Sequence, residues 1–389
     1  MKPINDRFRS SYFLELFLSV FSGALIGLIV VLFFKALDLI AHFQKDMNQH
    51  FFSIHLILLP VVLIVLHLVK KKTLYFPVKI FELSEHRQNE AQFWNSAMMP
   101  LHFLGTLLSH LSGASVGREG AVVMMAAGLV RLFKTSWQFW GPIFAAAGFA
   151  SAVGPFWIAP VFLAEVFQGR LKQQIYALLS AQMASIIMQL LSVPHLLSPL
   201  ELDNKMSFSQ KMIFVLLISF LGGSMMRYYK KYLLKWSEYF SHRSFYLRLG
   251  TSLVLAAILA VPLFQKYQSL SLYEIEQVMH QSTEWYDSML KLGITLLSLS
   301  IGFLGGDFVP LLFSSLSLGS VVSRWLSVDV AFGTLAASYL LFAGATRLRW
   351  TSYLLTLHLV GFGWWFWGYV SVSLVMRFAG QQSLYKRAY

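Results

Sequence analysis

The sequence predicts an all-α membrane protein whose transmembrane helices are tilted and in several cases broken. Hydrophobic residues make up 57% of the 389 positions and charged residues only 13%, whereas soluble domains carry roughly 25% charged residues. The 34 Phe, 16 Tyr and 11 Trp exceed what a soluble core of this size can hold. This composition excludes a soluble enzyme and a disordered chain. The absence of cysteine excludes disulfides, thiolate nucleophiles and zinc–sulfur sites.

Apolar segments recur along the whole chain, and many are too short to cross a bilayer. The first, at about 12–34, is long enough and predicts a retained membrane helix, because no small-residue cleavage site follows it. Its Gly23-x-x-x-Gly27 spacing would let a second helix approach closely, although simple helix flexibility explains it equally well. Later segments such as 120–133 are shorter than the roughly 20 residues of a full crossing. Helices must therefore end at membrane depth, lining a cavity or buried in protein.

The net charge of +13 comes from short basic clusters between the apolar segments. Clusters such as 70–72 and 227–235, together with the basic residues near both termini, indicate cytoplasmic ends of membrane helices. The acidic segment 266–291 is the best candidate for an external loop. We therefore expect a multi-pass protein of the cell inner (plasma) membrane, with both termini in the cytoplasm and no nucleic-acid partner.

Two Gly-rich breaks lie about half a chain length apart. The first is Gly117-Arg118-Glu119-Gly120 and the second is Gly305-Gly306-Asp307-Phe308-Val309-Pro310, and each precedes a short apolar segment. This similarity suggests an internal repeat, which in a membrane protein is often inverted. The predicted halves are residues 1–200 and 201–389, both transmembrane.

The breaks also suggest a chemistry. A helix that starts at such a break offers unpaired backbone N–H groups and a partial positive charge, which together bind an anion. Glu119 is placed to compete with that anion: when ionised it occupies the site, and when protonated or displaced it admits the ion. A lone glutamate in an apolar segment is costly and so indicates function. The alternative is that Glu119 only pairs with Arg118 at a membrane edge.

A second motif overlaps the first break. The residues Gly113-Ala114-Ser115-Val116-Gly117 fit G-x-S-x-G, the turn that carries the nucleophile of serine hydrolases. An intramembrane serine hydrolase would use Ser115 with His110 or His102 as its base. Because the motif normally requires a preceding strand in a soluble sheet, this is a remote alternative.

Five segments, taken in order, resemble motifs of the CLC chloride channels and proton-coupled anion antiporters, over roughly residues 95–389. They are VGREGAVV, AAAGFASAVGPFWIAPVFLAEVF, IGFLGGDFVPLLF, FAGATRLRWTSYLLTLHLVG and SLYKRAY. The fluoride-exporting branch is the nearer match, because it shares His110 before the gate and an acid, here Asp307, after the Gly-Gly pair. The resemblance implies the CLC-type inverted repeat and a homodimer.

By this resemblance, Glu119 is the external gating glutamate, and Asp307 and Glu165 lie on the proton route. The resemblance also implies anion contacts at Gly117, Arg118, Gly120, Gly306, Phe308, Val309 and Tyr385. Three of these residues have a structural alternative. Asp307 could be a helix N-cap, Glu165 a cytoplasmic helix-end charge, and Tyr385 an aromatic anchor at the membrane interface.

The function predicted from the sequence is fluoride export coupled to proton entry, with no enzymatic activity, cofactor or metal. A chloride channel or chloride/proton antiporter of the same fold is the alternative. One departure bears on the ion. Where the family has a Gly-x-Gly loop before the gate, this chain has Lys72-Thr73-Leu74-Tyr75-Phe76-Pro77, without either glycine. An expected set of backbone donors is therefore missing.

Overall fold

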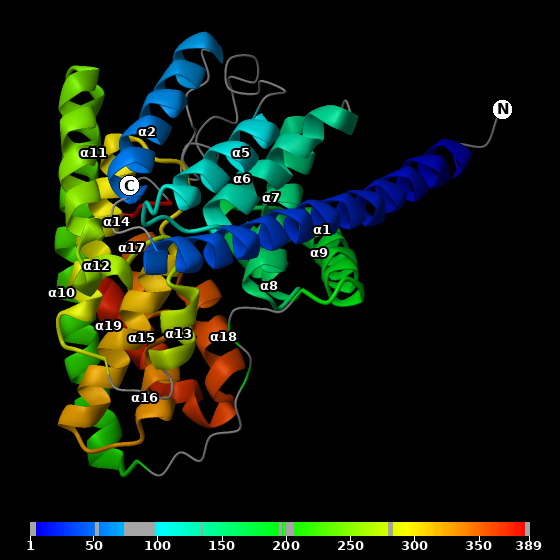
Figure 1. Cartoon of the computed structure of the whole chain (residues 1–389). Coiled ribbons are helices and arrows are strands. Elements are labelled where there is room, and N and C mark those ends of the chain that lie inside the picture. Colours follow the sequence, from blue (N-terminus) through cyan, green and yellow to red (C-terminus); the bar gives the residue numbers. More distant parts are fainter. Residues whose placement is uncertain are drawn as a thin grey trace.

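The computed structural model is a bundle of α-helices of very unequal length (Figure 1). It describes residues 5–50, 54–73, 98–133, 135–193, 197, 199, 206–278 and 283–385. Within these ranges, the only extended pairing is a single antiparallel bridge between Gly117 and Gly306. The all-α fold class is therefore confirmed.

The helices of the first part of the chain are α1 (Asn5–His50), α2 (Ile54–Thr73), α5 (Met98–Leu111), α6 (Glu119–Gly128), α7 (Trp137–Val153), α8 (Ile158–Phe167) and α9 (Leu171–Leu190). Those of the second part are α10 (Phe208–Ser241), α11 (Phe245–Ala260), α12 (Pro262–Gln265), α13 (Leu272–Val278), α14 (Asp287–Ile301), α15 (Phe308–Trp325), α16 (Val330–Ala337), α17 (Leu340–Thr346), α18 (Arg349–Val360) and α19 (Trp365–Phe378). Short 3₁₀ turns cover Leu129–Phe133 and Phe362–Trp364.

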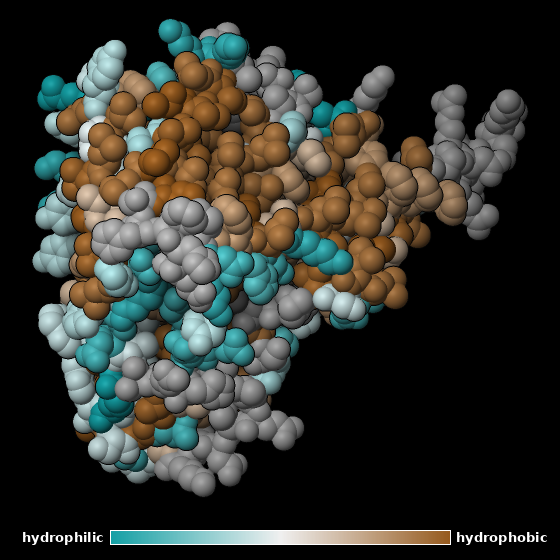
Figure 2. Space-filling model, viewed as in Figure 1, coloured by the Kyte–Doolittle hydropathy of each residue, from teal (hydrophilic) through white to brown (hydrophobic). Residues whose placement is uncertain are grey.

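Four helices in the described ranges are long and apolar enough to cross a membrane. Their spans are Tyr12–Asp46, Ile54–Lys72, Phe208–Ser241 and Phe308–Trp325. The first carries large apolar side chains that nothing in the molecule covers, such as Phe13, Leu32 and Leu39, which are 73%, 61% and 72% exposed. Figure 2 shows this apolar surface running along α1. Side chains of this kind are suited to face lipid.

Other helices are too short to span a bilayer. Both α6 and α8 have 10 residues. At 1.5 Å per residue they extend about 15 Å, half of a hydrocarbon core of about 30 Å. All residues of α6 from Glu119 to Ala127 are buried in the protein. The prediction of short helices that are buried in protein is therefore confirmed for α6, whereas the depth at which these helices end in the membrane stays a prediction.

The small-residue spacing in α1 has a packing role. A Cβ added at Gly23 would lie 2.3 Å from the carbonyl oxygen of Ser180, and one at Gly27 would lie 2.8 Å from that of Ala184. Both partners lie on α9, so the two glycines allow the backbones of α1 and α9 to touch. This contact confirms the close-approach prediction. The division into halves at residue 200 stays a prediction.

Candidate functional site

The two Gly-rich breaks meet each other. The N–H of Gly117 donates to the carbonyl of Gly306 over 2.5 Å, and the N–H of Gly306 donates back to the carbonyl of Gly117 over 2.7 Å. Side chains would not fit here. A Cβ at Gly117 would lie 3.1 Å from the backbone nitrogen of Val309, and one at Gly306 would lie 3.0 Å from that of Gly120. The glycines thus bring the starts of α6 and α15 into contact.

Each of these helix starts presents backbone donors. The first internal bond of α6 runs from the N–H of Val122 to the carbonyl of Arg118, and that of α15 from Leu311 to Asp307. The N–H groups of Gly120 and Ala121, and those of Phe308 and Val309, therefore have no acceptor within their own helix, whereas Pro310 has no N–H group. The helix dipole adds positive potential there. Five predicted contact residues share this place, namely Gly117, Gly120, Gly306, Phe308 and Val309.

Glu119 lies at the junction and is almost fully buried, with 1% of its surface exposed. Its carboxylate lies beside the backbone N–H groups of Arg118 and Glu119 itself. The Oε1 atom is 3.3 Å from Nε of Arg118, whereas Oε2 has no hydrogen-bond partner in the described structure. The ion pair with Arg118 therefore forms, but deep inside the protein rather than at its edge. The guanidinium of Arg118 stacks on Phe34, 3.8 Å from the ring centroid.

Asp307 directly precedes α15 but does not cap it, because its side chain makes no cap hydrogen bond. Instead the hydroxyl of Tyr385 donates to the Asp307 carboxylate. Tyr385 is only 5% exposed, so it is not an interfacial anchor. Its hydroxyl is also close enough to Glu119 for the charge of that carboxylate to act on it. The structure thus brings Glu119, Asp307 and Tyr385 together.

A buried lysine positions Tyr385. The Nζ atom of Lys230, on α10, donates to the carbonyl of Gly344 over 2.8 Å and to that of Gln382 over 2.6 Å. The N–H of Leu384 donates to the carbonyl of Ala345 over 2.9 Å. These bonds tie the segment before Tyr385 to the end of α17. No local pattern predicts this role, because Lys230 belongs to the basic cluster 227–235, which indicates a cytoplasmic end of a membrane helix.

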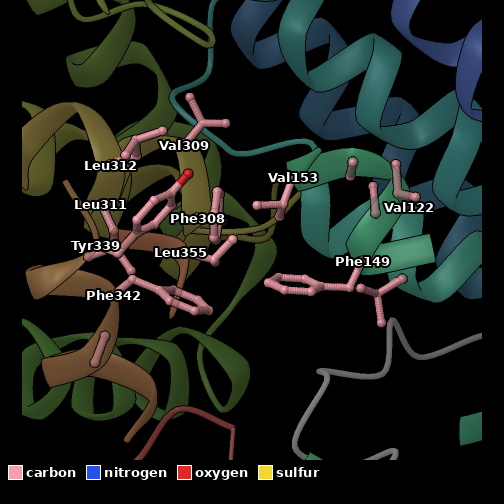
Figure 3. Close-up of a cluster of buried hydrophobic side chains, with 14 of the residues drawn as sticks. Val122, Phe149, Val153, Phe308, Val309, Leu311, Leu312, Tyr339, Phe342 and Leu355 are labelled. Atoms are coloured by element: carbon pink, nitrogen blue, oxygen red, sulfur yellow. The ribbon is translucent and has the colours of Figure 1, made fainter. Parts of the chain in front are cut away.

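Aromatic rings surround the junction. Figure 3 shows Phe308, Tyr339 and Phe342 on one side and Phe149 with Val153 on the other. The ring centroids of Phe308 and Phe342 are 4.8 Å apart, and those of Phe149 and Phe308 are 5.8 Å apart. The sequence analysis missed Tyr339, which lies near Glu119.

It also missed Tyr229 on α10. The hydroxyl of Tyr229 is buried without a hydrogen-bond partner in the described ranges, and it lies near both Asp307 and Tyr385. Both tyrosines look like ordinary core residues in the sequence, so no local pattern could have found them.

The residues of the hydrolase alternative do not assemble. The hydroxyl of Ser115 lies 2.7 Å from Oγ1 of Thr295, and Nδ1 of His110 lies 2.9 Å from Oγ of Ser269. No strand precedes Ser115, which follows the end of α5 through a turn. Since Ser115 and His110 bind different partners, these two residues do not form a nucleophile–base pair.

Glu165 lies at the end of α8 and binds the start of another helix. Its carboxylate accepts hydrogen bonds from the backbone N–H groups of Trp350 and Thr351, at 3.0 and 2.8 Å, and from the hydroxyl of Thr351 at 2.8 Å. It therefore caps α18 from a distant part of the chain, and its hydrogen-bond partners are Trp350 and Thr351 rather than Arg170 or Lys172. The proton role of Glu165 stays a prediction.

The cap predicts the effect of a Glu165→Gln substitution. Charged hydrogen bonds to two backbone N–H groups become neutral, so the free energy of unfolding should fall by about 1–3 kcal/mol. Thermal unfolding of the solubilised protein measures this loss. The matched control is Glu238→Gln, at an exposed position of α10, which should change nothing. A Glu165→Gln protein of unchanged stability that no longer couples protons would contradict the capping role.

Comparison with known proteins agrees with this geometry. Residues 78–375 match the family model for voltage gated chloride channels. The chain belongs to the voltage-gated chloride channel family. Members of this family are channels and transporters rather than enzymes. The predicted family resemblance and the multi-pass membrane character are therefore confirmed.

The family relatives differ in ion. A chloride/fluoride channel protein of Pseudomonas syringae is 28% identical over 287 residues, which cover 68% of this chain and 62% of that protein. A voltage-gated ClC-type chloride channel of Citrobacter koseri is 34% identical over 120 residues, covering 29% of this chain and 28% of that channel. The chain thus aligns with about three fifths of the length of the first of these relatives.

Solved structures of the family share the fold. The crystal structure of a CLC-type fluoride/proton antiporter superposes with a TM-score of 0.84 at 23% identity, covering 96% of this chain and 97% of that one. The structure of a slow cyanobacterial Cl⁻/H⁺ antiporter superposes with a TM-score of 0.80 at 17% identity, covering 95% of this chain and 96% of that one.

The divergent loop at 72–77 is described only in part. Lys72 and Thr73 end α2, and positions 74–77 lie outside the described residues.

Proposed function

We propose that this protein exports fluoride across a membrane in exchange for protons, with Glu119 as the gate. The observation that carries the proposal is the meeting of two helix starts at Glu119, with Asp307 and Tyr385 beside it. Two helix N-termini supply amide donors without a full positive charge, which suits an anion that must bind and leave again. Membership of the voltage-gated chloride channel family supports anion transport as the general activity.

Glu119 acts as a gate by competition. Its carboxylate lies beside the N–H groups of its own helix start, which are also donors that an anion would use. Because a carboxylate and an anion carry the same charge, the two exclude one another from this place. Protonation removes the charge of Glu119 and its preference for the donors. The anion then enters as the protonated side chain leaves, which links the two ion movements.

Fluoride is the proposed ion because of the donors around the junction. It is small and strongly hydrated, so a site must replace its water shell with several close donors. Backbone N–H groups, the hydroxyl of Tyr229 and the positive edges of the aromatic rings are available, and the hydroxyl of Tyr385 becomes a further donor when it leaves Asp307. The acid Asp307 after the glycine pair also favours the fluoride branch. Chloride transport by the same fold is the second candidate, favoured by the missing glycines at 72–77.

The proton route is proposed to join two carboxyl groups. Glu119 carries the proton in the outer part of the route and Asp307 in the inner part. The hydroxyl of Tyr385 is hydrogen-bonded to Asp307 and lies near Glu119. The wider organisation follows the family. We propose a homodimer in the cell inner membrane, with both termini in the cytoplasm and two inverted halves, residues 1–200 and 201–389.

Ion flux from liposomes tests the proposal. Purified protein in vesicles loaded with both salts should release fluoride much faster than chloride, as read by the two ion-selective electrodes. Vesicles without protein supply the background leak. Faster release of chloride would transfer the function to the chloride candidate, and release of neither ion would overturn anion transport.

A further inference from the structure

A pocket of about 580 Å³ opens on the surface between the second half of α1 and the segment 265–274. This segment begins the acidic stretch that the sequence places outside the cell. Figure 2 shows hydrophilic residues gathered over α13 on this face. The pocket is lined by Lys45 and Lys266 as well as by Asp38 and Glu274, so its wall is charged but balanced.

Behind this wall lies a buried lysine. The Nζ atom of Lys291 donates to the carbonyl of Ser269 and to the hydroxyl of Ser271, both at 2.8 Å, and to the carbonyl of Tyr267 at 3.0 Å. Both serines line the pocket, whereas Lys291 itself is 0% exposed. A buried cation therefore lies behind the pocket wall.

His110 continues from the same wall toward the gate. Its Nδ1 atom lies 2.9 Å from the hydroxyl oxygen of Ser269, and its own backbone carbonyl accepts a 2.5 Å bond from Gln44, which also lines the pocket. The ring is thus held at Nδ1, the backbone is held by Gln44, and the residue is 0% exposed. Its other nitrogen, Nε2, has no hydrogen-bond partner among the described residues. Buried polar atoms without partners are rare and call for an explanation, such as a missing ion.

The charges around His110 favour an anion. Lys291 and Arg118 are the charged groups that act on the imidazole, from α14 and from the break before α6. Of the acids in this region, Glu119 is paired with Arg118 and Asp287 with Lys266. Asp38 and Glu274 line the pocket. When the serine hydroxyl donates to Nδ1, the neutral imidazole carries its proton on Nε2 and becomes a donor. A negative ion would satisfy that donor, and the positive charges of Lys291 and Arg118 would favour it.

We propose that the Nε2–H group of His110 binds a small inorganic anion on its way between the pocket and Glu119. The inference rests on the proposed function, because the bound ion is the transported one. The site lies outside the helix-start junction and would load an anion while Glu119 still occupies that junction. Its affinity should rise when Glu119 is neutral, because Arg118 then loses its paired carboxylate.

Two substitutions at His110 test the donor. His110→Phe keeps the ring and removes both nitrogens, whereas His110→Gln keeps an N–H donor of similar reach. Measured as fluoride flux against fluoride concentration on the pocket side, His110→Phe should raise the half-saturating concentration about tenfold. His110→Gln should restore it to nearly the wild-type value. The maximal rate should change little in either variant, because the chemistry at Glu119 is intact.

The pocket is tested separately by its charge. The chain contains no cysteine, so Ala41→Cys, at an exposed position that lines the pocket, introduces a single reactive thiol. A membrane-impermeant methanethiosulfonate reagent with a negative charge should raise the half-saturating fluoride concentration, and one with a positive charge should lower it. The control is Glu276→Cys, which is exposed on α13 but does not line the pocket.

The outcomes separate the inference from the function it rests on. Active wild type with unchanged half-saturation in His110→Phe, or with reagents that act equally at Ala41→Cys and Glu276→Cys, overturns the anion site alone. A His110→Gln protein as impaired as His110→Phe would assign the ring a packing role and would also overturn it. Wild type that passes no anion overturns the proposed function and the inference with it.

Discussion

Glu119→Gln is expected to carry fluoride at a rate that no longer follows pH and to move no protons in exchange. Glutamine has the shape of a protonated glutamate but cannot titrate. In the structure the carboxylate lies at the start of α6, 3.3 Å from Nε of Arg118. Without its negative charge the side chain competes weakly with an anion for the same donors, so the gate behaves as permanently protonated. Parallel electrode measurements of fluoride and of proton movement in liposomes read both quantities.

A matched control is available in another paired glutamate. The Oε2 atom of Glu15, on α1, lies 2.7 Å from Nζ of Lys172, on α9. Neither residue belongs to the two Gly-rich breaks. Glu15→Gln should keep the wild-type pH profile even if it lowers stability. Should Glu119→Gln itself retain the wild-type pH profile and proton movement, Glu119 is not the gate.

Asp307→Asn is expected to separate the two ions: fluoride flux should persist, while an imposed pH gradient no longer drives it. The amide oxygen of asparagine can still accept the bond from Tyr385, so the local geometry survives the change. What is lost is the ability to hold a proton beside α15. The loss of coupling should be complete rather than partial, because an asparagine amide cannot take up a proton. Fluoride accumulation under a pH gradient measures it.

Asp329 provides the contrast to Asp307. It also precedes a helix, but its carboxylate does cap that helix, accepting the N–H of Phe332 at 2.7 Å. Asp329→Asn should therefore leave coupling intact. If Asp307→Asn also transports with full coupling, then Asp307 holds Tyr385 in place and carries no proton.

The sequence predicted the junction because both of its sides are local motifs. Glycines next to an acid, followed by a short apolar run, describe a helix start that must be approached closely, and this requirement is visible in the residues themselves. The sequence could not show that Gly117 and Gly306 bond to each other, since they are far apart in the chain. The sequence did indicate that the two breaks occupy similar positions in an internal repeat.

The residues that sequence reasoning missed are those defined by tertiary contacts. Lys230 belongs to a basic cluster whose other members face outward, and only the fold shows that its Nζ atom reaches the carbonyls of Gly344 and Gln382. Tyr229 precedes it and looks like any aromatic residue of a membrane helix. Glu165 was expected on the proton route or as a cytoplasmic charge at a helix end. It does lie at the end of α8, but its carboxylate caps α18, binding a backbone N–H group 185 positions further along the chain. Such partners follow from packing and have no local signature.

Proton-driven uptake of fluoride is the most direct test of the account. Liposomes containing the purified protein are prepared acidic inside and alkaline outside, with equal fluoride on both sides and the membrane potential clamped at zero by potassium and an ionophore. Protons leaving through an antiporter should drive fluoride inward, against the gradient that then develops. Hydrogen fluoride, which crosses lipid unaided, would move fluoride outward, so the leak cannot imitate the result. The account predicts net fluoride uptake that stops in Glu119→Gln. Net fluoride loss from the wild-type vesicles, at the rate of vesicles without protein, would contradict it.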